Sequence, residues 1–161
     1  MIFISRMKNM VQLIESINPD IKEKLAKAQP LFSDLTEDEI QTLATLLVEK
    51  RISTGQVIVR EGDPVDCVYL IVSGKADVRC AINPSEPDKT QSVATLSEKD
   101  AIGLSATGFY SLSGARTATV IALTDMVILR LSVPAFHGFV LSNTHVSDVL
   151  RKKAKKPDEK K

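Results

Sequence analysis

Arg116 and the glycine-led segment before it are the residues of this chain whose types best fit the binding of an anion. Arg116 opens the run Arg-Thr-Ala-Thr-Val, which has the composition of a β-strand. A guanidinium offers a planar fork of donors that matches a phosphate group. A segment of small residues follows Gly103, and a turn of helix there would add free backbone N–H groups and the positive end of a helix dipole. Together these features predict a phosphate site inside a β-structure.

The composition is that of an ordinary globular domain. The chain has 161 residues, of which 43% are hydrophobic and 25% charged, and this length suffices for one proper core. A net charge of +1 gives no bias toward nucleic acid or acidic membranes. The apolar start breaks off at Arg6, too early for a signal peptide or a membrane span. We therefore expect a cytoplasmic protein.

The side chains that could carry catalysis or hold a metal are sparse. Cys67 and Cys80 could pair, although reduced core cysteines are the expectation for a cytosolic protein. His137 and His145 fall on terminal helices with no carboxylate or cysteine at ligand spacing. The sequence has no phosphate-binding glycine loop followed by Lys-Ser/Thr and no nucleophile elbow. We expect neither a metal, nor a cofactor, nor an enzyme.

Helical patterns occupy the N-terminal part. Apolar residues recur at spacings of three and four over 7–17, and a second short helix is indicated over 21–28. Thr36 with Glu39 forms a capping-box pattern at the start of a further helix, whose buried stripe extends to Leu47.

The period changes to that of strands in the middle of the chain and returns to helical at the end. Strands are predicted at 57–59, 68–72, 76–82, 93–96, 117–123 and 126–131. Many short strands separated by glycine turns favour a barrel or jelly roll. Ser132 is placed to cap a helix, and residues 142–144 break it and begin another. The lysine-rich end, 152–161, is interpreted as a solvated tail.

This order of elements, together with its motifs, resembles the cyclic-nucleotide-binding domain. The family occurs in cyclic-nucleotide-dependent kinases, cyclic-nucleotide-gated channels and the bacterial catabolite activator. The resemblance covers roughly Leu31 to Arg151, and its marks are Leu31-Phe32, Gly55, Glu61-Gly62-Asp63, Asp66, Ser73-Gly74, Asp100-Ala101-Ile102-Gly103 and Arg116-Thr117-Ala118-Thr119-Val120. It implies an α+β fold, mainly β: a β-roll or jelly roll with N-terminal helices and two C-terminal helices. The expected division is a helical segment at 1–30, the binding domain at 31–151 and the tail.

The resemblance also implies a site. In the family, a Phe-Gly-Glu opening, a short helix of small residues and an arginine before a strand form a phosphate cassette, whose glutamate holds the ribose 2′-hydroxyl. The resemblance puts Ile102 and Gly103 at the opening, Ser105 and Ala106 in the short helix, and Arg116 at the cyclic phosphate.

Two departures from the family pattern bear on the ligand. Leu104 occupies the glutamate position and cannot accept a hydrogen bond from a sugar. The loss of one charged hydrogen bond costs about 1.5–3 kcal/mol, or about tenfold to a hundredfold in affinity. The segment from Gly103 to Arg116 is also longer than the usual cassette. Thr117 after the arginine is typical of members that accept cyclic GMP (cGMP) as well as cyclic AMP (cAMP), although it is also an ordinary residue to begin a strand.

Three functional hypotheses follow. The first is a regulatory sensor domain for cAMP or cGMP, with Leu150 and Arg151 as lid candidates over the purine. Its signal would pass to a protein partner, to a second copy in a homodimer or to a parent effector domain. The second is a degenerate module that binds no nucleotide and serves in protein interaction or dimerisation. The third is an altered choice of phosphate ligand. Nucleic acid is not expected as a partner, because no room for a helix-turn-helix follows Arg151.

Overall fold

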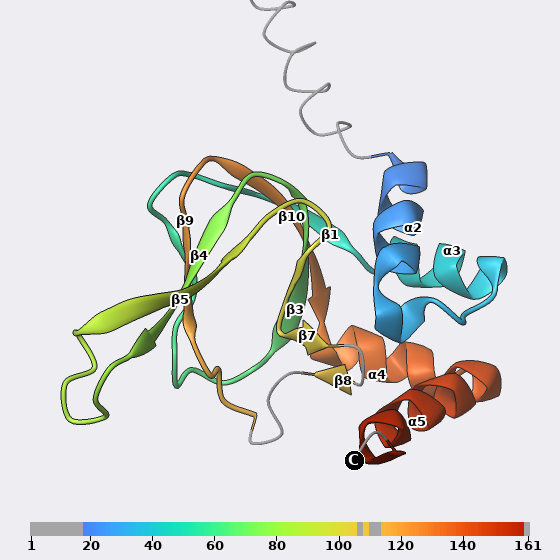
Figure 1. Ribbon diagram of the computed structural model, residues 1–161. Coiled ribbons are helices and arrows are strands. Elements are labelled where there is room, and N and C mark those ends of the chain that lie inside the picture. Colours follow the sequence, from blue (N-terminus) through green and yellow to red (C-terminus); the bar gives the residue numbers. More distant parts are fainter. Residues whose placement is uncertain (1–17, 106–107, 110–113, 160–161) are drawn as a thin grey trace, which may run out of the picture.

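A computed structural model describes residues 18–105, 108–109 and 114–159 (Figure 1). The helix expected over 7–17 and the site candidate Ala106 lie outside these residues. Of the helices in the described ranges, none combines the length and the hydropathy that crossing a membrane requires.

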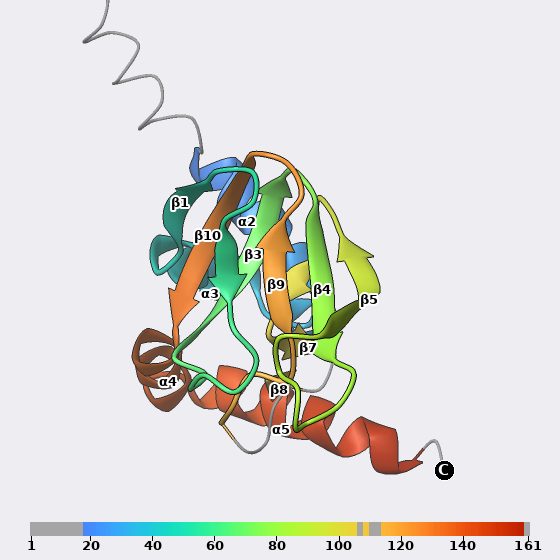
Figure 2. The same ribbon diagram turned by 90° about the vertical axis from the view of Figure 1, so that its left-hand side faces the viewer.

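Two four-stranded antiparallel sheets form a β-roll (Figures 1 and 2). The first has the order β1 (Val48–Ile52), β10 (Met126–Ser132), β3 (Cys67–Ser73), β6 (Ala101–Ile102). The second has the order β2 (Val57–Val59), β9 (Thr119–Ala122), β4 (Ala76–Ala81), β5 (Thr90–Leu96). A small ladder of β7 (Leu104–Ser105) and β8 (Gly108–Phe109) follows β6. The β-roll expected from the sequence is confirmed.

Strand β3 divides the interior into two cores, because successive side chains of a strand point to opposite faces. Val68 and Leu70 belong to a helix-side core, whereas Tyr69 and Ile71 belong to a roll core. The helix-side core comprises Leu25, Ala26, Leu31, Phe32, Leu35, Ile40, Leu43, Leu47, Val68, Leu70, Leu104, Leu129, Leu131, Phe136, Phe139 and Val146. The roll core comprises Ile52, Cys67, Tyr69, Ile71, Ala76, Ile102, Val120, Ala122, Met126 and Ile128.

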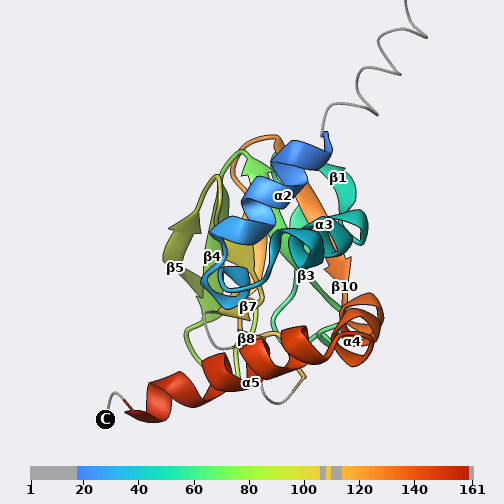
Figure 3. The same cartoon turned by 90° about the vertical axis from the view of Figure 1, so that its right-hand side faces the viewer.

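The helices gather on one side of the roll, over the sheet that contains β3 and β10 (Figures 1 and 3). They are α2 (Pro19–Ala28), the 3₁₀ turn η1 (Pro30–Phe32), α3 (Glu37–Thr45), α4 (Val133–Leu141) and α5 (Thr144–Glu159). The expected capping box is present, since the Thr36 hydroxyl accepts from the Glu39 N–H at 3.2 Å and the Glu39 carboxylate from the Thr36 N–H at 2.8 Å. The Ser132 hydroxyl caps α4 as expected, accepting from the Ala135 N–H at 3.2 Å.

The segment after Arg151, predicted as a solvated tail, is helical as far as Glu159, and Lys153 in it is buried whereas Lys152 and Ala154 are exposed. This segment continues helix α5, and the exposed fraction of Lys153 is only 9%. The Lys153 ammonium donates to the Pro30 carbonyl and, at 2.7 Å, to the Ser33 hydroxyl. A lysine can bury its aliphatic stem when its charged end finds partners, and here those partners lie at η1, far away in sequence.

Candidate ligand pocket

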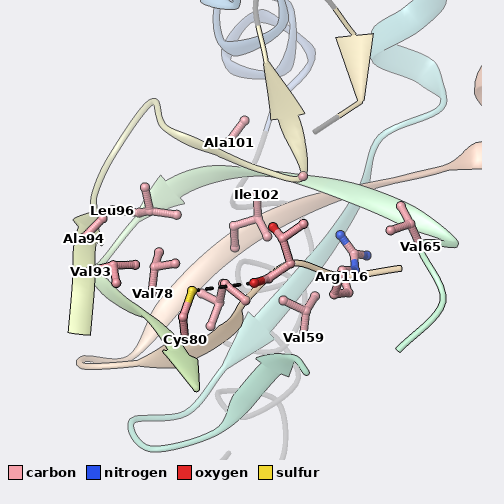
Figure 4. A pocket seen from close by; sticks show the side chains of 14 residues that line it. Val59, Val65, Val78, Cys80, Val93, Ala94, Leu96, Ala101, Ile102 and Arg116 are labelled. Atoms are coloured by element: carbon pink, nitrogen blue, oxygen red, sulfur yellow. Dashed lines mark hydrogen bonds between the residues drawn. The ribbon is translucent and has the colours of Figure 1, made fainter. Parts of the chain in front are cut away.

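A pocket of about 380 Å³ opens inside the roll, between β6 and the sheet formed by β2, β9, β4 and β5 (Figure 4). Three of the predicted site residues, Gly103, Arg116 and Thr117, lie in its wall. The complete lining is Val59, Val65, Val78, Cys80, Val93, Ala94, Leu96, Ala101, Ile102, Gly103, Arg116, Thr117, Ala118 and Val120. A volume of this size falls within the usual range for small-molecule sites, about 300–1,000 Å³.

Arg116 is the dominant polar group of this pocket. Its side chain is buried, and the residue is 8% exposed. Its Nη2 donates to the Cys67 carbonyl at 2.7 Å and lies 3.8 Å from the Asp66 carboxylate. Its Nη1 is buried and has no hydrogen-bond partner among the described residues. An unpaired buried donor costs about 1–3 kcal/mol, and more when it is charged.

The turn at Glu61-Gly62-Asp63 holds the backbone of Arg116 in place. The Arg116 N–H donates to the Asp63 carbonyl at 2.8 Å, and the Arg116 carbonyl accepts from the Gly62 N–H at 2.8 Å. Next to this pair, the Val65 N–H donates to the Gly114 carbonyl at 2.7 Å. The turn that the sequence identified by its glycine therefore fixes the point at which the arginine enters the pocket wall.

Gly103 lies so close to the guanidinium of Arg116 that a side chain at this position would require the guanidinium to shift. Its φ is +85°, a left-handed conformation that favours glycine. A Cβ at this position would lie 2.7 Å from Nη1 of Arg116. The glycine of the predicted cassette thus leaves the space that the arginine occupies.

The segment after Gly103 differs from the predicted short helix. Leu104 and Ser105 form strand β7, and the Ser105 hydroxyl donates to the Gly108 carbonyl at 3.0 Å. The added length of the segment allows Gly108, with φ of +148°, to pair back against Ser105. The helix-dipole contribution expected here is consequently not supported at these two residues.

Leu104 is buried at 8% exposure, but in the helix-side core and not in the pocket lining. The two lid candidates are also placed away from the lining. Leu150 packs against the helix-side core, whereas Arg151 is exposed and lies 3.4 Å from the Asp148 carboxylate. Their role as a lid stays a prediction.

The sequence reasoning did not anticipate that Cys80 would line the pocket. Cys80 is a free thiol whose Sγ lies 3.6 Å from the Thr117 carbonyl (Figure 4). Cys80 and Val78 both belong to the lining, two residues apart on β4. The alternation of this strand was visible in the sequence, but it did not reveal which face would meet the pocket.

The surroundings of Arg116 include a second arginine and a buried phenol. Asp66 is 73% exposed and lies 3.7 Å from Nη2 of Arg130 as well, so its attraction to either arginine is screened by water. Burial, together with the neighbouring Cys67, raises the pKa of Tyr69 to about 12, so that this phenol stays protonated.

Comparison with known proteins agrees with this geometry. The sequence model of the cyclic nucleotide-binding domain matches residues 49–143, which contain every residue of the pocket lining, Arg116 included. The chain belongs to this family. A cAMP-dependent protein kinase regulatory subunit from Blastocladiella emersonii is 26% identical over 140 residues, covering 83% of this chain and 33% of that protein. One from Colletotrichum orbiculare is 32% identical over 115 residues, covering 71% of this chain and 27% of that protein.

The chain thus spans about a third or less of the length of these curated relatives, which are regulatory subunits. Among solved structures, the N-terminal domain of a transcriptional regulator from Streptomyces coelicolor superimposes with a TM-score of 0.71 at 24% identity. The match covers 84% of this chain and 93% of that one, and it shows a shared fold.

Proposed function

We propose that this cyclic nucleotide-binding domain is a cytosolic regulatory sensor for cAMP or cGMP, and that Arg116 holds the cyclic phosphate. The observation that carries the proposal is the free Nη1 of Arg116, a buried cationic donor in the wall of the pocket. Backbone N–H groups of the segment that starts at Gly103 are the additional donors in this proposal. Thr117, beside the arginine, is the residue placed to contact the base or the phosphate.

The proposed role is binding and not catalysis. Among the described residues, no three His, Cys, Asp or Glu side chains gather as metal ligands, and the pocket lining contains no carboxylate or histidine. The output of binding would pass to a protein partner, to a second copy of the chain or to another domain of a longer protein.

Calorimetric titration with cAMP and cGMP tests the proposal on three proteins. Arg116→Ala should weaken binding by about tenfold to a hundredfold, since it removes a charged hydrogen-bond donor. Arg130→Ala is the matched control, because Arg130 also lies beside Asp66 but does not line the pocket. It should leave the affinity within about threefold, since exposed ion pairs contribute little.

Two results would contradict the proposal in different ways. The absence of both heat and a thermal shift at millimolar cAMP and cGMP would exclude the sensor function. Equal affinity of wild type and a folded Arg116→Ala variant would leave the function standing and exclude the placement of the phosphate.

A second candidate function, a protein-interaction or dimerisation module without nucleotide binding, is favoured by Leu104. This side chain lies in the helix-side core, at the position where the family carries a ribose-binding glutamate. Sedimentation of the protein with and without cAMP and cGMP distinguishes the two, because a stable dimer that binds neither nucleotide supports the second candidate.

A further inference from the structure

The pocket has one charged end and one apolar end. Arg116 lies at one side of the cavity, and Val93, Ala94 and Leu96 of β5 line the opposite side (Figure 4). Val93 is 53% exposed although it lines the pocket, so the apolar end is open to solvent. A ligand that fills the cavity therefore has its anionic group at Arg116 and its body against β5.

The described lining offers almost nothing to a neutral polar group. Arg116 is the single charged side chain in it, and apart from Thr117 and Cys80 the remaining side chains are aliphatic. Burial of apolar surface against such a wall contributes about 25 cal/mol per Å². A hydroxyl on the ligand body would find no charged side chain on this wall to bind it, and at the open end it would stay hydrogen-bonded to water.

Three acids, Asp66, Asp77 and Asp100, are direct neighbours of lining residues in the chain, and each has other partners. Asp77 precedes Val78, and its carboxylate accepts from the Ser92 hydroxyl and from Nη1 of Arg79. Asp66 follows Val65, but its carboxylate lies near the guanidinium groups of Arg116 and Arg130. Asp100 precedes Ala101, and its carboxylate accepts from the Ser97 N–H at 2.8 Å. In the described part of the chain, therefore, no carboxylate lines the cavity to accept a hydrogen bond from a ligand hydroxyl.

We propose that the pocket binds an anionic group attached to an apolar or aromatic body. We further propose that no side chain of the pocket forms a hydrogen bond with a hydroxyl on that body. Cyclic nucleotides then bind through phosphate and base, and their 2′-deoxy forms bind equally well. Sugar-free aryl phosphates belong to the same ligand class. This inference rests on the proposed function, because it requires the anionic group to lie at Arg116.

Four probes test it by calorimetry: cAMP, 2′-deoxy-cAMP, 1-naphthyl phosphate and inorganic phosphate. The affinities for cAMP and 2′-deoxy-cAMP should agree within about threefold, since a lost charged hydrogen bond would cost about tenfold or more. 1-Naphthyl phosphate should bind about tenfold or more tightly than inorganic phosphate, because only the former buries apolar surface.

Each contrary outcome has its own meaning. If the affinity for 2′-deoxy-cAMP is lower than that for cAMP by more than about tenfold, the protein forms a hydrogen bond with the 2′-hydroxyl. In that case the inference is wrong while the proposed function stands. If inorganic phosphate binds as tightly as 1-naphthyl phosphate, the apolar end is not used, and the inference is wrong again. If none of the four probes binds, the inference is wrong, and the proposed function is wrong as well if cGMP also fails to bind.

A pair of variants tests the apolar end separately. Val93→Ser should weaken binding of 1-naphthyl phosphate by about threefold or more through lost apolar contact, with inorganic phosphate unaffected. Leu123→Ser is the control, since Leu123 is similarly exposed, at 48%, and does not line the pocket. Equal effects of the two substitutions on 1-naphthyl phosphate would overturn the assignment of β5 as the apolar wall.

Discussion

A Cβ at position 103 would lie 2.7 Å from Nη1 of Arg116. The same nitrogen is the buried donor without a partner in the described residues. The absence of a side chain at Gly103 thus leaves room for the guanidinium in its present position. The two residues are thirteen positions apart in the chain and meet in the wall of the pocket.

Gly103→Ala should therefore weaken cyclic-nucleotide binding and also lower stability. The new methyl group displaces the guanidinium, and we expect about tenfold weaker binding, comparable to the loss of one charged hydrogen bond. Gly55→Ala is the matched control, because Gly55 has the same φ of +85° but nothing within 4 Å of its Cβ position. Calorimetry and thermal melts of both variants measure the two effects. Equal affinities of the two variants would show that contact with Arg116 does not matter.

Bound ligand should protect Cys80 from alkylation. Cys80 is half-buried in the pocket wall, whereas Cys67 is 1% exposed in the roll core. Iodoacetamide should therefore modify Cys80 in the folded protein and reach Cys67 only after unfolding. Mass spectrometry over time, with and without saturating cAMP, provides the measurement. If a saturating ligand left the alkylation rate of Cys80 unchanged, the ligand would bind elsewhere.

Lys153→Met should release the C-terminal helix from the N-terminal helices. Methionine retains an unbranched apolar stem but loses the hydrogen bonds to the Pro30 carbonyl and the Ser33 hydroxyl. The Pro30 carbonyl would lose its hydrogen-bond donor, and the loss of the hydrogen bonds from the ammonium group should reduce the free energy of unfolding by about 1–3 kcal/mol. Lys152→Met, an exposed neighbour in α5, should change it by less than about 0.5 kcal/mol. Urea denaturation of both variants measures this difference. Equal midpoints would show that the hydrogen bonds of Lys153 do not stabilise the fold.

Glu39 should make stability depend on pH in the acid range. Burial raises its pKa, but hydrogen bonds from the Thr36 N–H and from His145, at 2.9 Å, outweigh this, and the net pKa lies below the ordinary carboxyl value. A carboxyl whose folded-state pKa is lowered stabilises the protein above its unfolded-state pKa and loses that contribution as the pH falls through the folded-state value.

Glu39→Gln isolates this charge, because glutamine keeps an oxygen that can accept from Thr36. We expect the stability difference between wild type and Glu39→Gln to be present above the ordinary carboxyl pKa, about pH 4, and to shrink below it. Glu37→Gln, an exposed acid in the same helical turn, is the control. Urea denaturation between pH 2 and 5 provides the measurement, and a difference that persisted unchanged at the lowest pH would rule out the linkage.

Several local features of this protein could be predicted from the sequence. The Thr36–Glu39 capping box, the Ser132 cap and the strands on either side of Gly74 depend on residues close together in the chain, so their patterns carry the information. Arg116 could be singled out for the same reason, since it follows a segment with several glycines and precedes a strand, although β9 begins at Thr119 and not at Thr117 as predicted.

What only the tertiary structure decided depends on contacts between distant residues. Strand β1 was not predicted, because Val48–Ile52 becomes a strand through pairing with β10. Lys153 is buried only because η1 supplies its partners, although a lysine-rich end alone indicates a solvated tail. The placement of Leu104 in the helix-side core and of Cys80 in the pocket wall likewise follows from how the sheets and helices pack, which no local pattern encodes. The sequence by itself determined the family and its arginine, and the tertiary structure determined which side chains that arginine shares its pocket with.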